Sequence, residues 1–109
     1  MPGNPYDRAQ VVVLFRSALT DEAGDDYSAM AEAMLERARS FPGFVAFRRY
    51  AGEDGERLSV IWWEDHETLA AWRDDAKHRA AQTLGREKWY RWFQLEICDR
   101  ARASGYERA

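Results

Sequence analysis

The sequence predicts an α+β domain whose elements follow the order β-α-β-β-α-β. One observation is a pair of runs, residues 44–50 and 58–64, that are rich in aromatic and β-branched residues and flank a break rich in glycine and acidic residues. Such a pair predicts a β-hairpin. A second observation is that apolar residues before the hairpin recur at helical intervals, and that a helix N-cap signal follows the hairpin. A third is that one short apolar run precedes this region and another follows it.

Composition limits the classes of protein to consider. A chain of 109 residues is long enough for one core, and we expect a single domain. Its net charge of −3, with both signs interspersed, does not favour binding to nucleic acid or to an anionic membrane. The single cysteine, Cys98, excludes an internal disulfide and a multi-thiolate metal site, and is typical of a reducing compartment. Because no segment resembles a signal peptide or a membrane span, we expect a cytoplasmic protein.

Residues 10–17 form the first predicted strand, and residues 1–9 before it form a leader that we expect to be flexible. Successive side chains on a strand point to opposite faces. Both sets are apolar here, with Val11, Val13 and Phe15 on one face and Val12 and Leu14 on the other. We therefore expect this strand to be buried from both sides.

An amphipathic helix is predicted from about residue 25 to residue 40. Its apolar face consists of Tyr27, Met30, Met34, Ala38 and Phe41. Asp25 and Asp26 are the candidates for its N-cap, and the Pro42-Gly43 pair ends it. The predicted hairpin follows directly.

A second helical region starts after the hairpin, where Asp65 to Thr68 offer an N-cap ahead of an apolar group that ends at Trp72. We expect a bend near Asp74-Asp75, a continuation through residues 77–84, and a break at Gly85.

Residues 91–98 form the last predicted strand, in which Phe93, Leu95 and Ile97 alternate with more polar residues and form a core side. Cys98 is expected to be a small buried apolar residue. Residues 101–109 are a polar C-terminal tail in which Tyr106 is a candidate anchor to a neighbouring subunit.

This order of elements is the ferredoxin-like arrangement, with an antiparallel four-stranded sheet and helices on one face. The helices leave the other face open, although the first three strands carry large apolar residues on both faces. An open apolar face of that size favours burial against a second copy, so we expect a homodimer with its sheets packed face to face.

The chain resembles the antibiotic biosynthesis monooxygenase family of the dimeric α+β barrel superfamily over residues 10–100. The residues that carry the resemblance are Phe41-Pro42-Gly43-Phe44, Trp62-Trp63-Glu64, Leu69 with Trp72, His78, and Trp89-Tyr90.

The resemblance implies a ligand pocket between the sheet and the second helical region, with Trp72, His78 and Gln82 lying over Phe15 and Trp63. A planar ligand would also contact Trp89. The alternative for each of Trp63, Trp72 and Trp89 is a residue of the core or of the dimer interface. Cofactor-free oxygenation of an aromatic compound needs an apolar slot and a group that takes the phenolic proton, and it requires no metal. Thr68 stands where the monooxygenase branch tends to have an asparagine, and it is a further candidate substrate contact.

His78 is the candidate general base or proton shuttle, and Asp74 four residues earlier is placed to orient its ring and favour its charged form. The alternative is a surface histidine paired with a surface aspartate. The other histidine, His66, is expected to be solvated. Arg16, at the end of the first strand, is either an anion-binding residue or a solvated one.

The leading hypothesis is a cofactor-independent monooxygenase that oxidises a small aromatic or polyketide-like substrate with molecular oxygen. One alternative is a non-catalytic binding module for a planar hydrophobic ligand. Another is a heme-binding or heme-degrading enzyme. In that branch a histidine serves as the heme ligand, but Gln82 occupies the matching position here and His78 lies about one turn earlier.

Overall fold

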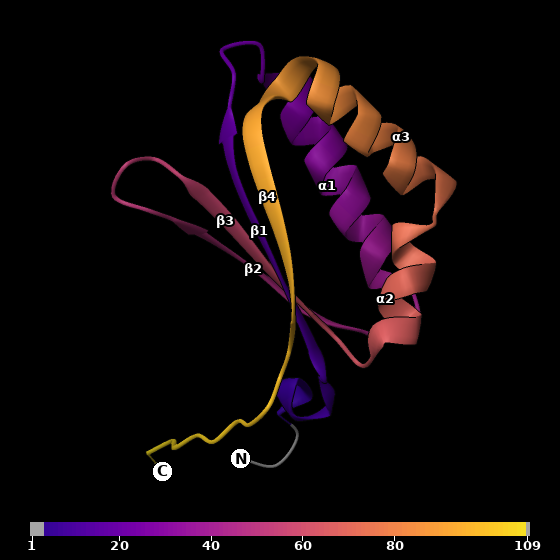
Figure 1. The fold of residues 1–109 in the computed structure, drawn as a ribbon, viewed down its shortest axis with the longest axis vertical. Helices are drawn as coiled ribbons and strands as arrows, with labels where there is room; N and C mark the ends of the chain where they lie inside the picture. The colour runs from indigo at the N-terminus through magenta and orange to yellow at the C-terminus, as the bar shows by residue number, and fades with distance from the viewer. Residues whose placement is uncertain (1–3, 109) are drawn as a thin grey trace.

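The computed structural model describes residues 4–108 and confirms the predicted order of elements. From the N-terminus these are η1 (Pro5–Arg8), β1 (Val11–Leu19), α1 (Asp25–Arg39), β2 (Phe44–Ala51), β3 (Arg57–Trp63), α2 (His66–Arg73), α3 (Ala76–Leu84), η2 (Gly85–Trp89) and β4 (Tyr90–Asp99). The expected bend separates α2 from α3, and Gly85 begins η2, a single π-helical turn. The helices α1, α2 and α3 all lie on one face of the sheet (Figure 1).

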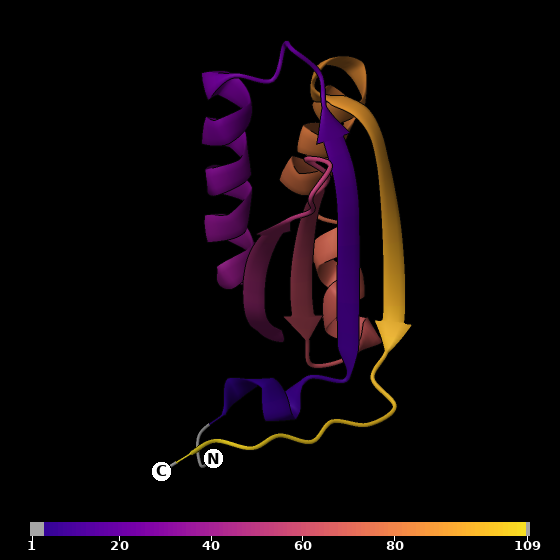
Figure 2. The ribbon, with the colours of Figure 1, turned by 90° about the vertical axis from the view of Figure 1, so that its left-hand side faces the viewer.

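The sheet is antiparallel with strand order β2-β3-β1-β4. Figure 2 turns its helix-free face to the viewer, with η1 and the C-terminal tail passing its lower end. Register places residues of three strands in rows across the helix-facing side. Read from β3 through β1 to β4, these rows are Ile61-Val13-Ile97, Ser59-Phe15-Leu95 and Arg57-Ser17-Phe93. The rows form the floor on which the helices pack.

The core lies between the sheet and α2, where Trp63 and Leu69 pack with Val11 and Val13. Trp63 is 1% exposed and meets the ring of Phe44 edge-on at a centroid distance of 5.7 Å. Val11 and Val13 are buried, as expected for the inner face of the first strand. Burial of large apolar side chains here fixes α2 against the sheet.

Two caps were predicted, and one of them is wrong. Asp65 caps α2 as expected, accepting a hydrogen bond from the Thr68 backbone N–H at 2.8 Å. In α1, however, the N-cap is Gly24. Asp26 instead accepts hydrogen bonds from Lys88 Nζ at 2.6 Å and Trp89 Nε1 at 3.3 Å. These bonds, chiefly that from Lys88, lower the pKa of Asp26 to about 2 and tie the start of α1 to η2.

Gly43 makes the corner between α1 and β2. Its φ of +89° lies in the left-handed region, and a Cβ built there would approach Thr68 Cβ to 2.2 Å. Only glycine meets both conditions without strain. The close approach lets the start of α2 pack directly on this corner.

The prediction that one side of the last strand is core is wrong for most of its length. Leu95 and Ile97 face the helix side but are 47% and 43% exposed, and Cys98 is exposed rather than buried. Strand β4 is an edge strand, so it has a neighbouring strand on one side only. Alternation gave the correct face, but the helices do not extend over it.

The segment around η1 packs against the end of the sheet. Tyr6 packs edge-on against Trp62 at a centroid distance of 4.9 Å, and Arg100 Nη1 donates to the Tyr6 carbonyl at 2.7 Å. Residues 1–3 of the leader and residue 109 of the tail lie outside the described residues. Residues 101–108 are exposed, including Tyr106. Among the described residues no helix is long and apolar enough to cross a membrane.

Candidate functional site

A cavity of about 280 Å³ lies between the helix-facing side of the sheet and the helices α1, α2 and α3. Its floor includes Phe15, Ser59 and Ile61, and its roof includes Met30, Trp72 and Gln82. The lining is mainly apolar and aromatic, with a few polar groups. This composition is typical of small-molecule sites.

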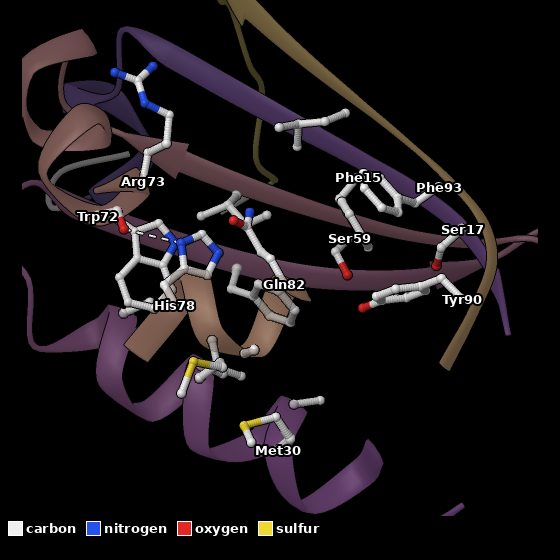
Figure 3. A pocket seen from close by; sticks show the side chains of 18 of the residues that line it. Phe15, Ser17, Met30, Ser59, Trp72, Arg73, His78, Gln82, Tyr90 and Phe93 are labelled. Carbon is white, nitrogen blue, oxygen red and sulfur yellow. Dashed lines mark hydrogen bonds between the residues drawn. The ribbon is translucent and has the colours of Figure 1, made fainter. Parts of the chain in front are cut away.

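Trp72 and His78 form one end of the cavity. Their rings stack at a centroid distance of 4.1 Å and an interplanar angle of 14°, and Phe41 meets Trp72 edge-on at 5.1 Å. His78 Nδ1 lies 3.1 Å from the backbone carbonyl oxygen of Trp72. Because a carbonyl oxygen only accepts, Nδ1 carries the hydrogen, and in the neutral ring Nε2 carries the lone pair. Figure 3 shows Nε2 directed into the cavity toward Gln82.

Burial lowers the pKa of His78, against weaker opposing effects of the Trp72 carbonyl and Asp75. The expectation that Asp74 orients this ring is therefore wrong, as is the expectation that the charged form is favoured. Asp74 pairs instead with Arg79 at 3.2 Å. The ring of His78 meets the Trp72 carbonyl instead, across the bend between α2 and α3. The neutral imidazole that results is the form that accepts a proton.

Asp75 holds the start of α3 in place. Its carboxylate accepts a hydrogen bond from the His78 backbone N–H at 3.0 Å and two from Arg37 of α1, at 2.7 and 2.8 Å. The Arg37 bonds are the main reason that the pKa of Asp75 lies well below its usual range. Two helices of the roof are thereby joined beside His78.

Hydroxyl groups mark the other end of the cavity. Ser17, Ser59 and Tyr90 all direct their oxygens into it (Figure 3). Burial is the largest cause of the raised pKa of Tyr90, so this phenol stays protonated and can donate a hydrogen bond. Phe15 stacks on Phe93 at 5.5 Å and meets Tyr90 edge-on at 5.4 Å.

The structure brings together most of the predicted site residues. Those that line the cavity are Phe15, Trp72, His78, Gln82 and Trp89. Trp63 and Thr68 do not line it, contrary to expectation. Trp63 is part of the core, and Thr68 donates its hydroxyl to the Asp65 carbonyl at 3.1 Å while its side chain packs on Gly43. His66 is exposed beside Asp99, 2.5 Å away.

Sequence reasoning missed the hydroxyl end of the site. Apart from Arg57 at the start of β3, Ser17 and Ser59 interrupt otherwise apolar inner faces of β1 and β3, and this interruption was the available signal. Ser17 is only 2% exposed, so its polarity is not a surface effect. Among residues 4–108 no group of three or more His, Cys, Asp or Glu side chains is arranged to hold a metal ion.

Comparison with known proteins adds information on ancestry. A family model described as antibiotic biosynthesis monooxygenase matches residues 10–84. The protein YqjZ of Bacillus subtilis, described as uncharacterized, is 30% identical over 96 residues, covering 88% of this chain and 80% of that protein. The jasmonate monooxygenase ABM of Pyricularia oryzae is 30% identical over 87 residues, which span 78% of this chain but 40% of that protein.

Solved structures share the fold. Rv0793 from Mycobacterium tuberculosis has a TM-score of 0.76 and 17% identity, covering 89% of this chain and 100% of that one. SnoaB, a cofactor-independent oxygenase from Streptomyces nogalater, has a TM-score of 0.74 and 16% identity, covering 91% and 99%. At such identities the likeness concerns the fold alone.

Proposed function

The chain belongs to the antibiotic biosynthesis monooxygenase family, and from this premise we propose that it is a cofactor-independent monooxygenase acting on a small aromatic or polyketide-like substrate with dioxygen. One observation carries the proposal. His78 is held in the tautomer whose Nε2 is a base, and Nε2 is directed into an apolar, aromatic cavity. That is the arrangement required to take a phenolic proton where bulk water is scarce.

In the proposed reaction a phenolic substrate supplies all the electrons. His78 Nε2 takes the phenolic proton, the phenolate transfers electrons to dioxygen, and a C–O bond forms at the ring carbon para to the hydroxyl. The O–O bond then breaks, and the outer oxygen leaves as water with the hydrogen of that carbon and the first proton. One phenol and one dioxygen thus become one quinone and one water.

The other lining residues have supporting roles in this proposal. Trp72 stacks on His78 and supplies the carbonyl that fixes its tautomer, so it both positions the base and offers a flat surface to the substrate. Gln82, one helical turn after His78, directs its amide into the cavity and is placed to hydrogen-bond a substrate oxygen. Phe15 and Trp89 complete the aromatic lining.

Dioxygen uptake tests the proposal. With a panel of phenols and naphthols that carry a hydrogen at the para carbon, and a blank for autoxidation, we expect one dioxygen consumed per quinone formed, without release of hydrogen peroxide and without added flavin, metal or heme. The same protein is titrated with hemin. A Soret band that depends on His78, with uptake only after hemin is added, would support the heme alternative. Binding of planar ligands without uptake would support the binding module.

We also propose that the protein is a homodimer joined through the helix-free face of the sheet. Tyr50 and Trp92 are 50% and 40% exposed on that face, beside the half-buried Leu14 and Trp62. Large apolar side chains gathered on one face mark an interaction surface.

Sedimentation velocity at micromolar concentration tests the dimer, with an expected mass of roughly twice the 12.7 kDa of one chain. Leu14→Asp places a charge on the proposed interface and is expected to give a monomer. Ala33→Asp adds the same charge on the exposed side of α1 and should remain dimeric. A wild-type monomer that stays soluble contradicts the proposal.

A further inference from the structure

The charges around the cavity are all of one sign. The chain has 19 acidic and 16 basic residues, yet the cavity lining contains four arginines and no aspartate or glutamate. These arginines are Arg49, Arg57, Arg73 and Arg86. Such a bias in an acidic protein indicates a preference for an anionic ligand.

Two of the four arginines have other partners. Arg49 forms an ion pair with Glu32 at 2.9 Å, and Arg73 lies 3.7 Å from Asp74 and is directed away from the cavity in Figure 3. Arg57 and Arg86 form no ion pair with any residue in the described range 4–108. The anion-binding role considered for Arg16 is also filled, because Glu56 pairs with it at 2.6 Å.

The two free arginines lie at the same end of the cavity. Arg57 is in the same row of the sheet as Ser17 and Phe93, and its guanidinium lies 5.4 Å from the centre of the Tyr27 ring. Arg86, from η2, lies 5.6 Å from the centre of the Phe93 ring. Stacking on aromatic rings holds both guanidinium groups at the cavity margin and leaves their N–H groups free to donate.

This cationic end is opposite the base. Trp72 packs against the core that contains Trp63, at one end of β3, whereas Arg57 begins β3 at the other end. Figure 3 shows the same separation, with His78 and Trp72 on one side and Ser17 and Tyr90 on the other. Tyr90, whose pKa is raised, adds a neutral hydroxyl donor beside the arginines.

We propose that the substrate is a carboxylic acid whose carboxylate binds Arg57 and Arg86, while its apolar body lies in the cavity with the reacting ring toward His78. Arginine is suited to this role because its planar fork of N–H donors matches a carboxylate. The inference rests on the proposed function for the identity of the reacting end. The binding of the acid end stands on the arginines alone.

Calorimetric binding without dioxygen tests the inference. The probes are 6-hydroxy-2-naphthoic acid and its carboxamide, which match in shape and differ in charge. We expect the acid to bind roughly tenfold more tightly than the amide at neutral pH and low salt. The double variant Arg57→Gln/Arg86→Gln should abolish this preference and leave the affinity for the amide unchanged. Added salt should reduce the preference in the wild type.

Arg39→Gln/Arg102→Gln is the matched control, because it removes the same number of charges from exposed residues that do not line the cavity. It should keep the preference for the acid. Equal binding of acid and amide overturns the inference, as does a preference that survives in the Arg57→Gln/Arg86→Gln variant or disappears in the control. His78→Gln should keep the preference. If the protein prefers the acid but oxidises no phenol, the proposed function is contradicted and the binding of the acid end still holds.

Discussion

His78→Gln is expected to lower the rate of dioxygen consumption roughly a hundredfold to ten-thousandfold, the usual range for loss of a general base. Ligand affinity should change little, because glutamine retains a polar side chain of similar length. The expectation follows because no other side chain that lines the cavity accepts a proton at neutral pH, so nothing replaces His78 Nε2 as the base. Dioxygen uptake under saturating substrate measures the effect, and calorimetry with 6-hydroxy-2-naphthoic acid in the absence of dioxygen measures binding.

The pH dependence gives an independent reading of the same group. Burial holds the pKa of His78 below its ordinary value of 6.5. Only the neutral ring accepts a proton, so the rate should be level at neutral pH and fall as the pH drops through this lowered pKa. A half-maximal rate at a pH above 6.5 contradicts the assignment of His78 as the base.

The other histidine supplies the control. His66→Gln changes an exposed residue beside Asp99, which does not line the cavity. It should leave the rate and its pH dependence unchanged. If both variants lose activity equally, or if neither does, His78 is not the base.

The fold was predictable because each element depends on a local pattern. The change from an aromatic and β-branched run in residues 58–64 to a capped helical segment after Asp65 requires only neighbouring residues to be recognised, and the cap at Asp65 depends on the next turn of the same helix. The bend at Asp74-Asp75 has the same local character. Elements of this kind need no knowledge of tertiary contacts.

The site was only partly predictable, because the direction and cover of a side chain are tertiary properties. Trp63 and Thr68 lie close to Trp72 in sequence, but packing of α2 on the sheet turns them into the core and toward Gly43. Leu95 alternates correctly, yet no local pattern reveals that β4 is the edge strand.

The cationic end shows the same limit more clearly. Arg57 and Arg86 are 29 positions apart in the sequence. They lie at the same end of the cavity only because β3 pairs with β1, β1 pairs with β4, and η2 places Arg86 beside Phe93. Nothing in the spacing of the two arginines marks them as a pair. Register is set by the whole sheet, so a site that depends on register becomes visible only in the structure.

Trp63→Ala is expected to reduce the free energy of unfolding by about 3–5 kcal/mol, the usual effect of truncating a buried aromatic residue. The side chain is 1% exposed and packs with Val11, Leu69 and Phe44, so its removal leaves a cavity that the sheet and α2 cannot close without moving. For a domain of this size the loss is a large part of the total stability. Denaturant unfolding at one fixed protein concentration measures it, because dimerisation makes stability depend on concentration.

Trp72→Phe is the informative comparison, because Trp63 and Trp72 were both predicted to contact the substrate. Phenylalanine keeps an aromatic ring between Phe41 and His78, so the free energy of unfolding should fall by about 1 kcal/mol or less. Affinity for a planar ligand should fall instead, since the smaller ring covers less of the cavity roof. If Trp63→Ala is stable and loses mainly ligand affinity, Trp63 belongs to the site after all. We therefore expect Trp63 to contribute mainly to the packing of α2 on the sheet, and Trp72 to contribute mainly to ligand binding in the cavity.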